Sequence, residues 1–342
     1  MTSPRQPTAA ESAADPVAMP TGLVEQVGDW LEASIGLDCG RVGRNAVARA
    51  VSAAWPDAAR TTSETVAGWL AGDSPERQRL IDAIVVSESW FLREPRVFDH
   101  VTTVVRTRLE HQRQVTLLSA PCAAGEEAYS LAVALLQAGI AAERFRIIAA
   151  DLSPRAIAAA RRGVFTENAF RAAAADLRPR WFTATAAGWA VSDAVRQPVH
   201  FLEANLLDPA SRSRLRAEAG GPFDLICCRN LLIYLTAQAR QAVEQTLAEL
   251  LAPEGEVIVG AAEAVILPAG RWQPTGPLAF GRRTQAAGEP PLQTLGPRAT
   301  PPLRPRPAAR PQPTPPLPQP PAPPAAPVAT ATGPAPPPPA PP

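Results

Sequence analysis

The chain has 342 residues, of which 46% are hydrophobic, and its formal net charge is +1. A charge this close to zero argues against the strongly basic surface that binds nucleic acid or an anionic membrane. All 33 basic residues are arginine. This excludes chemistry that depends on lysine, such as a Schiff base or a phosphate-loop lysine.

The two ends of the chain have the composition of unfolded polypeptide. Residues 1–20 are small, polar and interrupted by proline, a pattern that does not match a signal peptide. About two dozen of the 41 prolines lie after Glu289. We therefore expect a disordered arm over residues 1–20 and a disordered, proline-rich tail over residues 287–342.

Cysteine spacing and hydropathy favour a cytoplasmic protein without a metal site. The four cysteines show neither a C-x-x-C pair nor the spacing of a zinc site, and we expect reduced thiols. They are Cys39, Cys122, Cys227 and Cys228. No apolar run approaches the ~20 residues that span a bilayer, so direct insertion into a membrane is not expected.

Residues 21–90 have the pattern of a small helical domain followed by a linker. Apolar residues recur at helical spacing from Leu23 to Ile35, and Gly36 provides a stop signal. Further short helices are expected near residues 42–51, 65–70 and 78–86.

From residue 91 to residue 286 the expected strands and helices alternate. Strands are expected at residues 115–119, 145–150, 199–203, 223–228 and 256–260, helices at 126–138, 153–162 and 237–251, and a last strand pair at 272–274 and 279–283. This alternation predicts a mostly parallel sheet with helices on both faces, which binds ligands at the carboxyl ends of its strands. Alternation around Gly188 predicts a small inserted β-hairpin subdomain at about residues 182–200.

Residues 117–130 are the most informative stretch of the chain. An apolar run ends at a turn of small residues with Gly125, and Glu126 and Glu127 open the next helix. This is the strand–turn–helix of a nucleotide-type site. Because carboxylates would repel a phosphate, they favour a nucleoside that carries positive charge, such as S-adenosylmethionine. A nicotinamide dehydrogenase is disfavoured, since G-x-G-x-x-G is absent.

Polar residues follow the other strands of the predicted sheet. Asp151 ends the second strand, where a carboxylate can accept both hydroxyls of a ribose. Its alternative role, capping the next helix, is already filled by Ser153. Two further strand ends carry Asn205, Leu206, Arg229 and Asn230. Such residues lie on the ligand-binding rim, where a side-chain amide can read an adenine edge.

The segment 87–95 joins the helical domain to the sheet and reads Ser-Glu-Ser-Trp-Phe-Leu-Arg-Glu-Pro. Two interpretations stay open from these residues alone. Trp90 and Phe91 can be ordinary packing beside a surface charge at Arg93, or the segment can line the site.

Taken in order, the motifs resemble the chemotaxis receptor methyltransferases, the CheR family, over roughly residues 22–283. The resemblance rests on residues 89–93, 122–130 and 149–153, and above all on Cys-Arg-Asn-Leu-Leu-Ile-Tyr at 228–234. Residues 36–38 and 83–86 are most similar to the WspC-like branch. The resemblance implies a class I, Rossmann-like S-adenosylmethionine methyltransferase fold with a small N-terminal helical domain.

The resemblance also implies an activity and the residues that perform it. The activity is that of a protein-glutamate O-methyltransferase, acting on the cytoplasmic coiled coil of a methyl-accepting chemoreceptor. Matched by position, the cofactor-binding residues are Ser87, Ser89, Arg93, Glu127, Asp151, Asn205, Leu206, Arg229 and Asn230, and the catalytic residues are Arg93 and Tyr234. The chain departs from the family pattern at Ser87, Ser89, Leu92 and Ala128.

The chemistry of this reaction fits the residues present. A glutamate carboxylate, with a reference pKa of about 4.3, is ionised at neutral pH and needs neither a general base nor a metal. The enzyme must align the carboxylate with the methyl group and exclude water. Arg93 would hold the carboxylate by paired hydrogen bonds, and Tyr234 would orient it.

Two other functions remain as alternatives: a non-catalytic cofactor-binding scaffold, and a methyltransferase that acts on RNA or a small molecule. The retained Arg93, Arg229 and Tyr234 argue against the first, and the near-zero net charge argues against the second. The basic helix with which the family docks on receptors is represented only thinly, by Arg41, Arg44 and Arg49. The hairpin is too compact for the receptor tether of some relatives. A monomer is expected.

Overall fold

The computed structural model describes residues 21–85, 88–171, 173 and 176–283, whose contacts place them in one compact unit. The predicted arm and tail, and Ser87 among the predicted site residues, lie outside the described residues.

The first described segment is helical, as the sequence predicts. It contains α1 (Thr21–Ile35), α2 (Cys39–Val42), α3 (Arg44–Ala54), η1 (Ala58–Arg60), α4 (Ser63–Leu70) and α5 (Pro75–Ile84). The apolar face of α1 is buried, with Val27 and Leu31 fully inaccessible. Helix α1 ends at Ile35 and is followed by Gly36, where φ is +69° and an added Cβ would lie 2.3 Å from the Cβ of Ala239. Only glycine fits both this conformation and this close approach.

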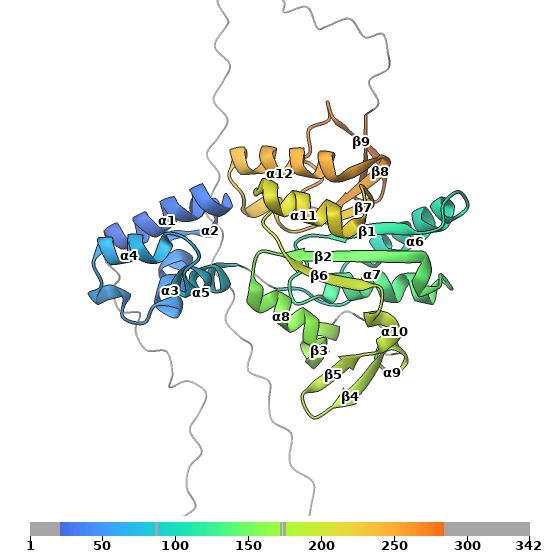
Figure 1. Cartoon of the computed structure of the whole chain (residues 1–342), viewed down its shortest axis with the longest axis horizontal. Coiled ribbons are helices and arrows are strands. Elements are labelled where there is room, and N and C mark those ends of the chain that lie inside the picture. The colour runs from blue at the N-terminus through green and yellow to red at the C-terminus, as the bar shows by residue number, and fades with distance from the viewer. Residues whose placement is uncertain (1–20, 86–87, 172, 174–175, 284–342) are drawn as a thin grey trace, which may run out of the picture. The chain divides into compact units, whose positions relative to one another are not determined.

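A seven-stranded sheet forms the centre of the second segment (Figure 1), in the order β6-β2-β1-β7-β8-β10-β9. Its strands are β1 (Val115–Ser119), β2 (Phe145–Asp151), β6 (Val199–Glu203), β7 (Phe223–Cys228), β8 (Leu251–Val259), β9 (Trp272–Gly276) and β10 (Ala279–Arg282). The pairs from β6 to β8 are parallel, and β10 is antiparallel to both its neighbours. The strand order reverses between β1 and β7, which is where α/β sheets bind ligands.

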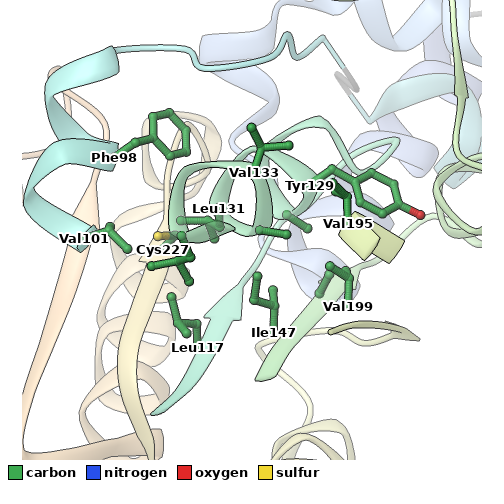
Figure 2. Packing of buried hydrophobic residues seen from close by; sticks show 14 of the residues in the cluster. Phe98, Val101, Leu117, Tyr129, Leu131, Val133, Ile147, Val195, Val199 and Cys227 are labelled. Carbon is green, nitrogen blue, oxygen red and sulfur yellow. The ribbon is translucent and has the colours of Figure 1, made fainter. Parts of the chain in front are cut away.

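Helices cover both faces of the sheet. They are α6 (Pro95–Leu109), α7 (Glu126–Gln137), α8 (Pro154–Arg162), α11 (Pro209–Ala219) and α12 (Ala237–Leu250), with a short η2 (Ala142–Arg144) before β2 and η4 (Leu232–Tyr234) before α12. Figure 2 shows one core layer, in which Phe98 of α6 and Leu131 of α7 pack near Leu117 of β1. The next residue, Leu118, packs on the opposite face under α11 and α12. The central strands β1, β2 and β7 are therefore buried on both faces, which explains their continuous apolar runs.

A second, three-stranded sheet is inserted after α8. The predicted hairpin is present as β4 (Phe182–Thr185) paired antiparallel with β5 (Gly188–Val191), and β3 (Val164–Phe165) adds a third strand on the other side of β5. The short elements around it are η3 (Glu167–Phe170), α9 (Leu177–Trp181) and α10 (Asp193–Arg196). Phe91 of the segment that precedes α6 packs against three phenylalanines of this region, Phe165, Phe170 and Phe182.

The α/β fold with a helical segment and an inserted hairpin is thus confirmed. Helices α2, α6, α9, α10 and α11 and strand β3 were not predicted from the sequence, and β8 begins at Leu251 rather than at residue 256. Among the described residues, no helix is both long enough and apolar enough to cross a membrane.

Candidate functional site

A pocket lies at the carboxyl ends of β1, β2 and β7, beside the point where the strand order reverses. One wall comes from the helical segment, through Ile35, Leu37 and Val42, and another from the segment that precedes α6. Seven of the predicted site residues line this pocket: Ser89, Arg93, Glu127, Asp151, Arg229, Asn230 and Tyr234. Residues from five separate parts of the sequence therefore meet in one place.

Asn205 and Leu206 line an adjoining pocket instead, which shares Pro121, Asp151 and Leu231 with the first. The amide of Asn205 is engaged by the backbone on both sides. Its Nδ2 donates to the carbonyl of Ser34 at 3.3 Å, and its Oδ1 accepts from the amide of Leu207 at 3.0 Å. In this arrangement Asn205 ties the loop after β6 to α1, and its amide keeps a second N–H and a second oxygen lone pair for contact with a ligand.

Arg229 is the centre of the site's buried charge network. Its side chain is only 2% exposed. Its Nη1 donates to Glu127 Oε2 at 3.0 Å, and its Nη2 donates to Glu94 Oε2 at 2.8 Å and to the carbonyl of Arg93 at 2.9 Å. One guanidinium thus joins the end of β7, the start of α7 and the segment that carries Arg93.

Glu127 is held on its other side by Ser119, whose hydroxyl donates to Oε1 at 2.8 Å. Both carboxylate oxygens are therefore fixed before any ligand arrives. The helix that carries Glu127 begins at Gly125, where φ is +98° and an added Cβ would lie 3.1 Å from Ala160. The tight turn between β1 and α7 depends on this glycine.

Asp151 lies at the end of β2 and is 3% exposed. Its Oδ2 accepts from the amide of Ala123 at 2.8 Å, and its Oδ1 accepts from the amide of Ser153 at 3.0 Å. Burial raises the pKa of this carboxyl, although the backbone donors oppose the shift. Ser153 itself caps α8, as the sequence predicts, so Asp151 is left to face the pocket.

The loop after β7 is held by a residue that the sequence analysis missed. Glu263 is completely buried, and its carboxylate accepts from the backbone amides of Asn230, Leu231 and Leu232, each at 2.7 Å. Asn230 adopts φ of +61° in this loop. Glu263 lies just past the end of β8 at Val259, and this position after a strand end was the signal in the sequence that could have identified it.

Tyr234 is positioned by contact with the helical segment. Its carbonyl accepts from the amide of Asp38 at 2.7 Å, and the amide of Thr236 donates to the carbonyl of Gly36 at 2.9 Å. A β-bridge between Leu37 and Leu235 lies between these bonds. The helical segment and the loop that carries Tyr234 therefore form one continuous wall.

Backbone strain is concentrated around the pocket. Five non-glycine residues of the described chain have positive φ, and four of them belong to segments that line the pocket: Leu92, Glu94, Ala123 and Asn230. Each such residue costs of order 1–3 kcal/mol, and such strain clusters at functional sites because surrounding contacts hold it there. Leu92 and Glu94 flank Arg93, so the residues on both sides of this arginine have the strained conformation.

Outside the pocket, the arginines of the helical segment are largely neutralised. Arg41 pairs with Asp38 at 2.9 Å, and Arg44 pairs with Glu25 at 3.0 Å. Arg49 is exposed. The surface is therefore less positive than its arginine content implies. The four cysteines are free thiols, and within the described ranges no cluster of histidine, cysteine and carboxylate side chains has the arrangement of a metal site.

Arg229→Met is expected to lower the free energy of unfolding by about 3–5 kcal/mol, because it leaves two carboxylates without their buried cation. Urea unfolding followed by circular dichroism measures the loss. The matched control is the uncharged triple variant Arg229→Met/Glu94→Gln/Glu127→Gln, which should recover most of the stability. A single variant within about 1 kcal/mol of wild type would mean that the network contributes little.

Glu126 gives a prediction for pH. It is 7% exposed, and burial raises its pKa from 4.5 to about 7. Hydrogen bonds from the backbone amides of Glu126 and Ala124, together with the positive charge of Arg171, partly oppose this rise in pKa. Between these values the unfolded chain has lost the proton while the folded chain keeps it. The free energy of unfolding should therefore fall as pH rises through this window, by at most about 1.4 kcal/mol per pH unit.

Glu126→Gln should flatten that slope, whereas the exposed control Glu143→Gln should not. The raised pKa of Asp151 acts in the same direction, so a smaller slope should remain in Glu126→Gln. Urea unfolding at a series of pH values between about 4 and 8 makes the comparison. Parallel curves for wild type and Glu126→Gln would contradict the assignment.

Known proteins are similar to this chain in sequence. Residues 87–273 match the family model "CheR methyltransferase, SAM binding domain". A "Probable biofilm formation methyltransferase WspC" of Pseudomonas aeruginosa is 37% identical over 265 residues, which cover 75% of this chain and 61% of that protein. The WspC protein of Pseudomonas putida is 35% identical over 250 residues, covering 72% of this chain and 58% of that protein.

The "Chemotaxis protein methyltransferase 1" of Pseudomonas aeruginosa is 31% identical over 204 residues, which cover 55% of this chain and 70% of that protein. The chain spans about three-fifths of the length of the two WspC proteins. The matched family model covers more than half of the chain, including the segment before α6, the turn into α7 and the loops after β2 and β7. The chain therefore belongs to the CheR methyltransferase family, and S-adenosylmethionine is the ligand of its matched domain.

Proposed function

We propose that the protein transfers a methyl group from S-adenosylmethionine to glutamate side chains of a methyl-accepting chemoreceptor, giving glutamate methyl esters. The observation that carries the proposal is the position of Arg93. It lines the same pocket as Asp151 and Glu127, and none of the described carboxylates forms an ion pair with its guanidinium. A cation at the pocket that is not neutralised by the protein suits an anionic substrate.

The residues around the pocket fit the cofactor. Asp151 offers a buried carboxylate at the end of β2, where a ribose would be held. Arg229 offers its Nε, which is buried and lacks a hydrogen-bond partner among the described residues. An orphaned donor of this kind is costly unless a ligand satisfies it, and the carboxylate of the methionine portion would do so. We assign Ser89, Glu127, Asn205, Leu206 and Asn230 to the same ligand.

The bound cofactor supplies an electrophilic methyl group. The protein's own contribution is placement, because a glutamate carboxylate is already ionised at neutral pH. Arg93 would hold both carboxylate oxygens with its planar fork, and Tyr234 would close the opposite side of the pocket. The apolar wall of Leu37, Val42 and Val85 would exclude water from the nucleophile.

The substrate and setting follow from the same proposal. Relatives named chemotaxis methyltransferases support a chemoreceptor as the partner, and its cytoplasmic coiled coil as the part that is methylated. We accordingly propose that the protein works in the cytoplasm as a monomer. A helical domain at residues 21–90 would cover the cofactor of a methyltransferase domain at residues 91–286, with its small subdomain at about 182–200.

Asp151→Ala should weaken the binding of S-adenosylhomocysteine by about 1–3 kcal/mol, because the ribose hydroxyls lose their acceptor. Isothermal titration calorimetry on the full chain measures the affinity. Asp208→Ala, which removes a carboxylate that caps α11 outside the main pocket, serves as the control. If the Asp151 and Asp208 variants bind equally well, the ribose site lies elsewhere.

Arg93→Ala should lower methyl transfer to a chemoreceptor cytoplasmic fragment by about 10²-fold or more, because the carboxylate loses its positioning. Arg93→Lys should recover only part of the rate, since one ammonium cannot reproduce the planar fork. Transfer of radiolabel from S-adenosylmethionine measures both rates.

The nearby exposed Arg96 provides the control, and Arg96→Ala should methylate at the wild-type rate. A wild-type rate in Arg93→Ala would mean that this arginine is only a surface charge beside packed aromatic rings. Binding of S-adenosylmethionine without methylation of any receptor fragment would instead favour a non-catalytic scaffold.

A further inference from the structure

We propose that Trp90 and Arg171 are positioning residues for Arg93. They would hold its guanidinium at the pocket, in the orientation that receives the substrate carboxylate. The inference rests on the proposed function and extends it to two residues outside the matched cofactor set. The relevant group is a stack of charged and aromatic side chains, formed by Glu88, Trp90, Arg93 and Arg171, which we call the Trp90 stack.

The indole of Trp90 contacts two guanidinium groups at once. The Cζ of Arg93 lies 4.3 Å from the ring centroid, and the Cζ of Arg171 lies 4.0 Å from it. Both distances are well within the ~6 Å limit of a cation–π interaction. Trp90 and Arg93 line the pocket, whereas Arg171 follows η3, next to the three-stranded sheet. The stack therefore links the pocket to a distant part of the sequence.

The two arginines of the stack differ in how their charge is balanced. Arg171 Nη2 pairs with Glu88 Oε1 at 2.8 Å, and Arg171 Nη1 donates to the carbonyl of Asn168 at 3.1 Å. For Arg93, only the contact with Trp90 is found among the described side chains. Glu88 therefore neutralises the supporting arginine, and Arg93 keeps a charge that can pair with a substrate carboxylate.

The backbone beneath the stack is already fixed, so only the side chain of Arg93 needs further support. The amide of Phe91 donates to the carbonyl of Ala169 at 2.8 Å, and the amide of Leu92 donates to the hydroxyl of Ser130 at 2.9 Å. The carbonyl of Arg93 accepts from Arg229. Beyond this anchored backbone, Arg93 has four side-chain bonds to rotate, and contact with Trp90 restricts them.

Restriction before binding favours the reaction, because the entropy of ordering a long side chain is then not lost when the substrate arrives. Arg171 adds to this effect because it contacts the same indole. Its position is set by Glu88 and by the end of η3, where Phe170 stacks on Phe91 with centroids 4.8 Å apart. The region of the three-stranded sheet thus holds Arg171 in place through packing and through charge.

Steady-state kinetics on the full chain tests the proposal, with a receptor cytoplasmic fragment that the wild type methylates. Trp90→Leu should lower kcat for methyl transfer by about 5- to 30-fold, because it removes the aromatic face that orients Arg93. The KM for S-adenosylmethionine should stay within about 2-fold. Trp90→Phe keeps an aromatic face and should recover most of the rate, while Arg171→Gln should give a smaller loss.

Trp189→Leu is the matched control, because Arg178 lies 5.0 Å from the Trp189 ring in a similar stack that does not line the pocket. It should leave kcat unchanged. A wild-type kcat in Trp90→Leu, or a Trp90→Phe variant no better than Trp90→Leu, would overturn the proposal. So would an equal loss in Trp189→Leu.

A second measurement does not depend on the substrate. In a ¹⁵N–arginine NMR spectrum, the Nε–Hε signal of Arg93, assigned with Arg93→Lys, should carry a ring-current shift from Trp90. The shift should disappear in Trp90→Leu and persist in Trp90→Phe. An Arg93 signal at the same position in wild type and in Trp90→Leu would contradict the positioning role of Trp90. Absence of methylation by the wild type would count against the proposed function alone.

Discussion

The buried guanidinium of Arg229 is the interaction on which the site depends. It connects Glu127 at the start of α7 to Glu94 and to the backbone of Arg93, which are neighbours in a segment far from α7 in the sequence. Burying a charge is costly unless opposite charges and hydrogen bonds surround it, and here two carboxylates and a carbonyl do so. The pairing works in one geometry only, so the same electrostatic requirement that stabilises the network also fixes the place of Arg93 relative to the strand ends.

A second buried charge fixes the conformation of the neighbouring loop after β7. The carboxylate of Glu263 accepts hydrogen bonds from three successive backbone amides. These bonds hold Asn230 at positive φ and bring Tyr234 to the pocket. Backbone hydrogen bonds to the helical segment then secure Tyr234 from the other side. Strained residues can persist around the pocket because these contacts over-determine their conformation. The helical segment is therefore part of the site, since without it one wall would lack its hydrogen-bond partners.

The sequence predicted the elements whose patterns are local. Strands buried on both faces, such as β1 and β7, appear as short apolar runs and have the expected bounds, as does the partly exposed edge strand β6. Helix α6 was not predicted, although Val97, Phe98, Val101 and Val105 recur at helical spacing and form a buried stripe. Strand β3 has two residues and forms only by pairing with β5, so no local sequence pattern could predict it. Among site residues, those at strand ends could be found from position. Glu94 could not, because its role arises from a contact with Arg229.

The proposed chemistry explains why the residues of the site serve to position the substrate rather than to transfer a proton. A carboxylate nucleophile is already in its reactive ionic form at neutral pH, so the barrier is lowered mainly by alignment and by exclusion of water. Alignment requires side chains whose freedom is removed before the substrate binds. The ion pairs of Arg229, the amides gathered by Glu263 and the aromatic contact of Arg93 each remove such freedom at a different level, from backbone to side chain. Because these contacts fix different groups around the pocket, the site needs all of them at once, and its lining residues come from separate segments between Ile35 and Leu235.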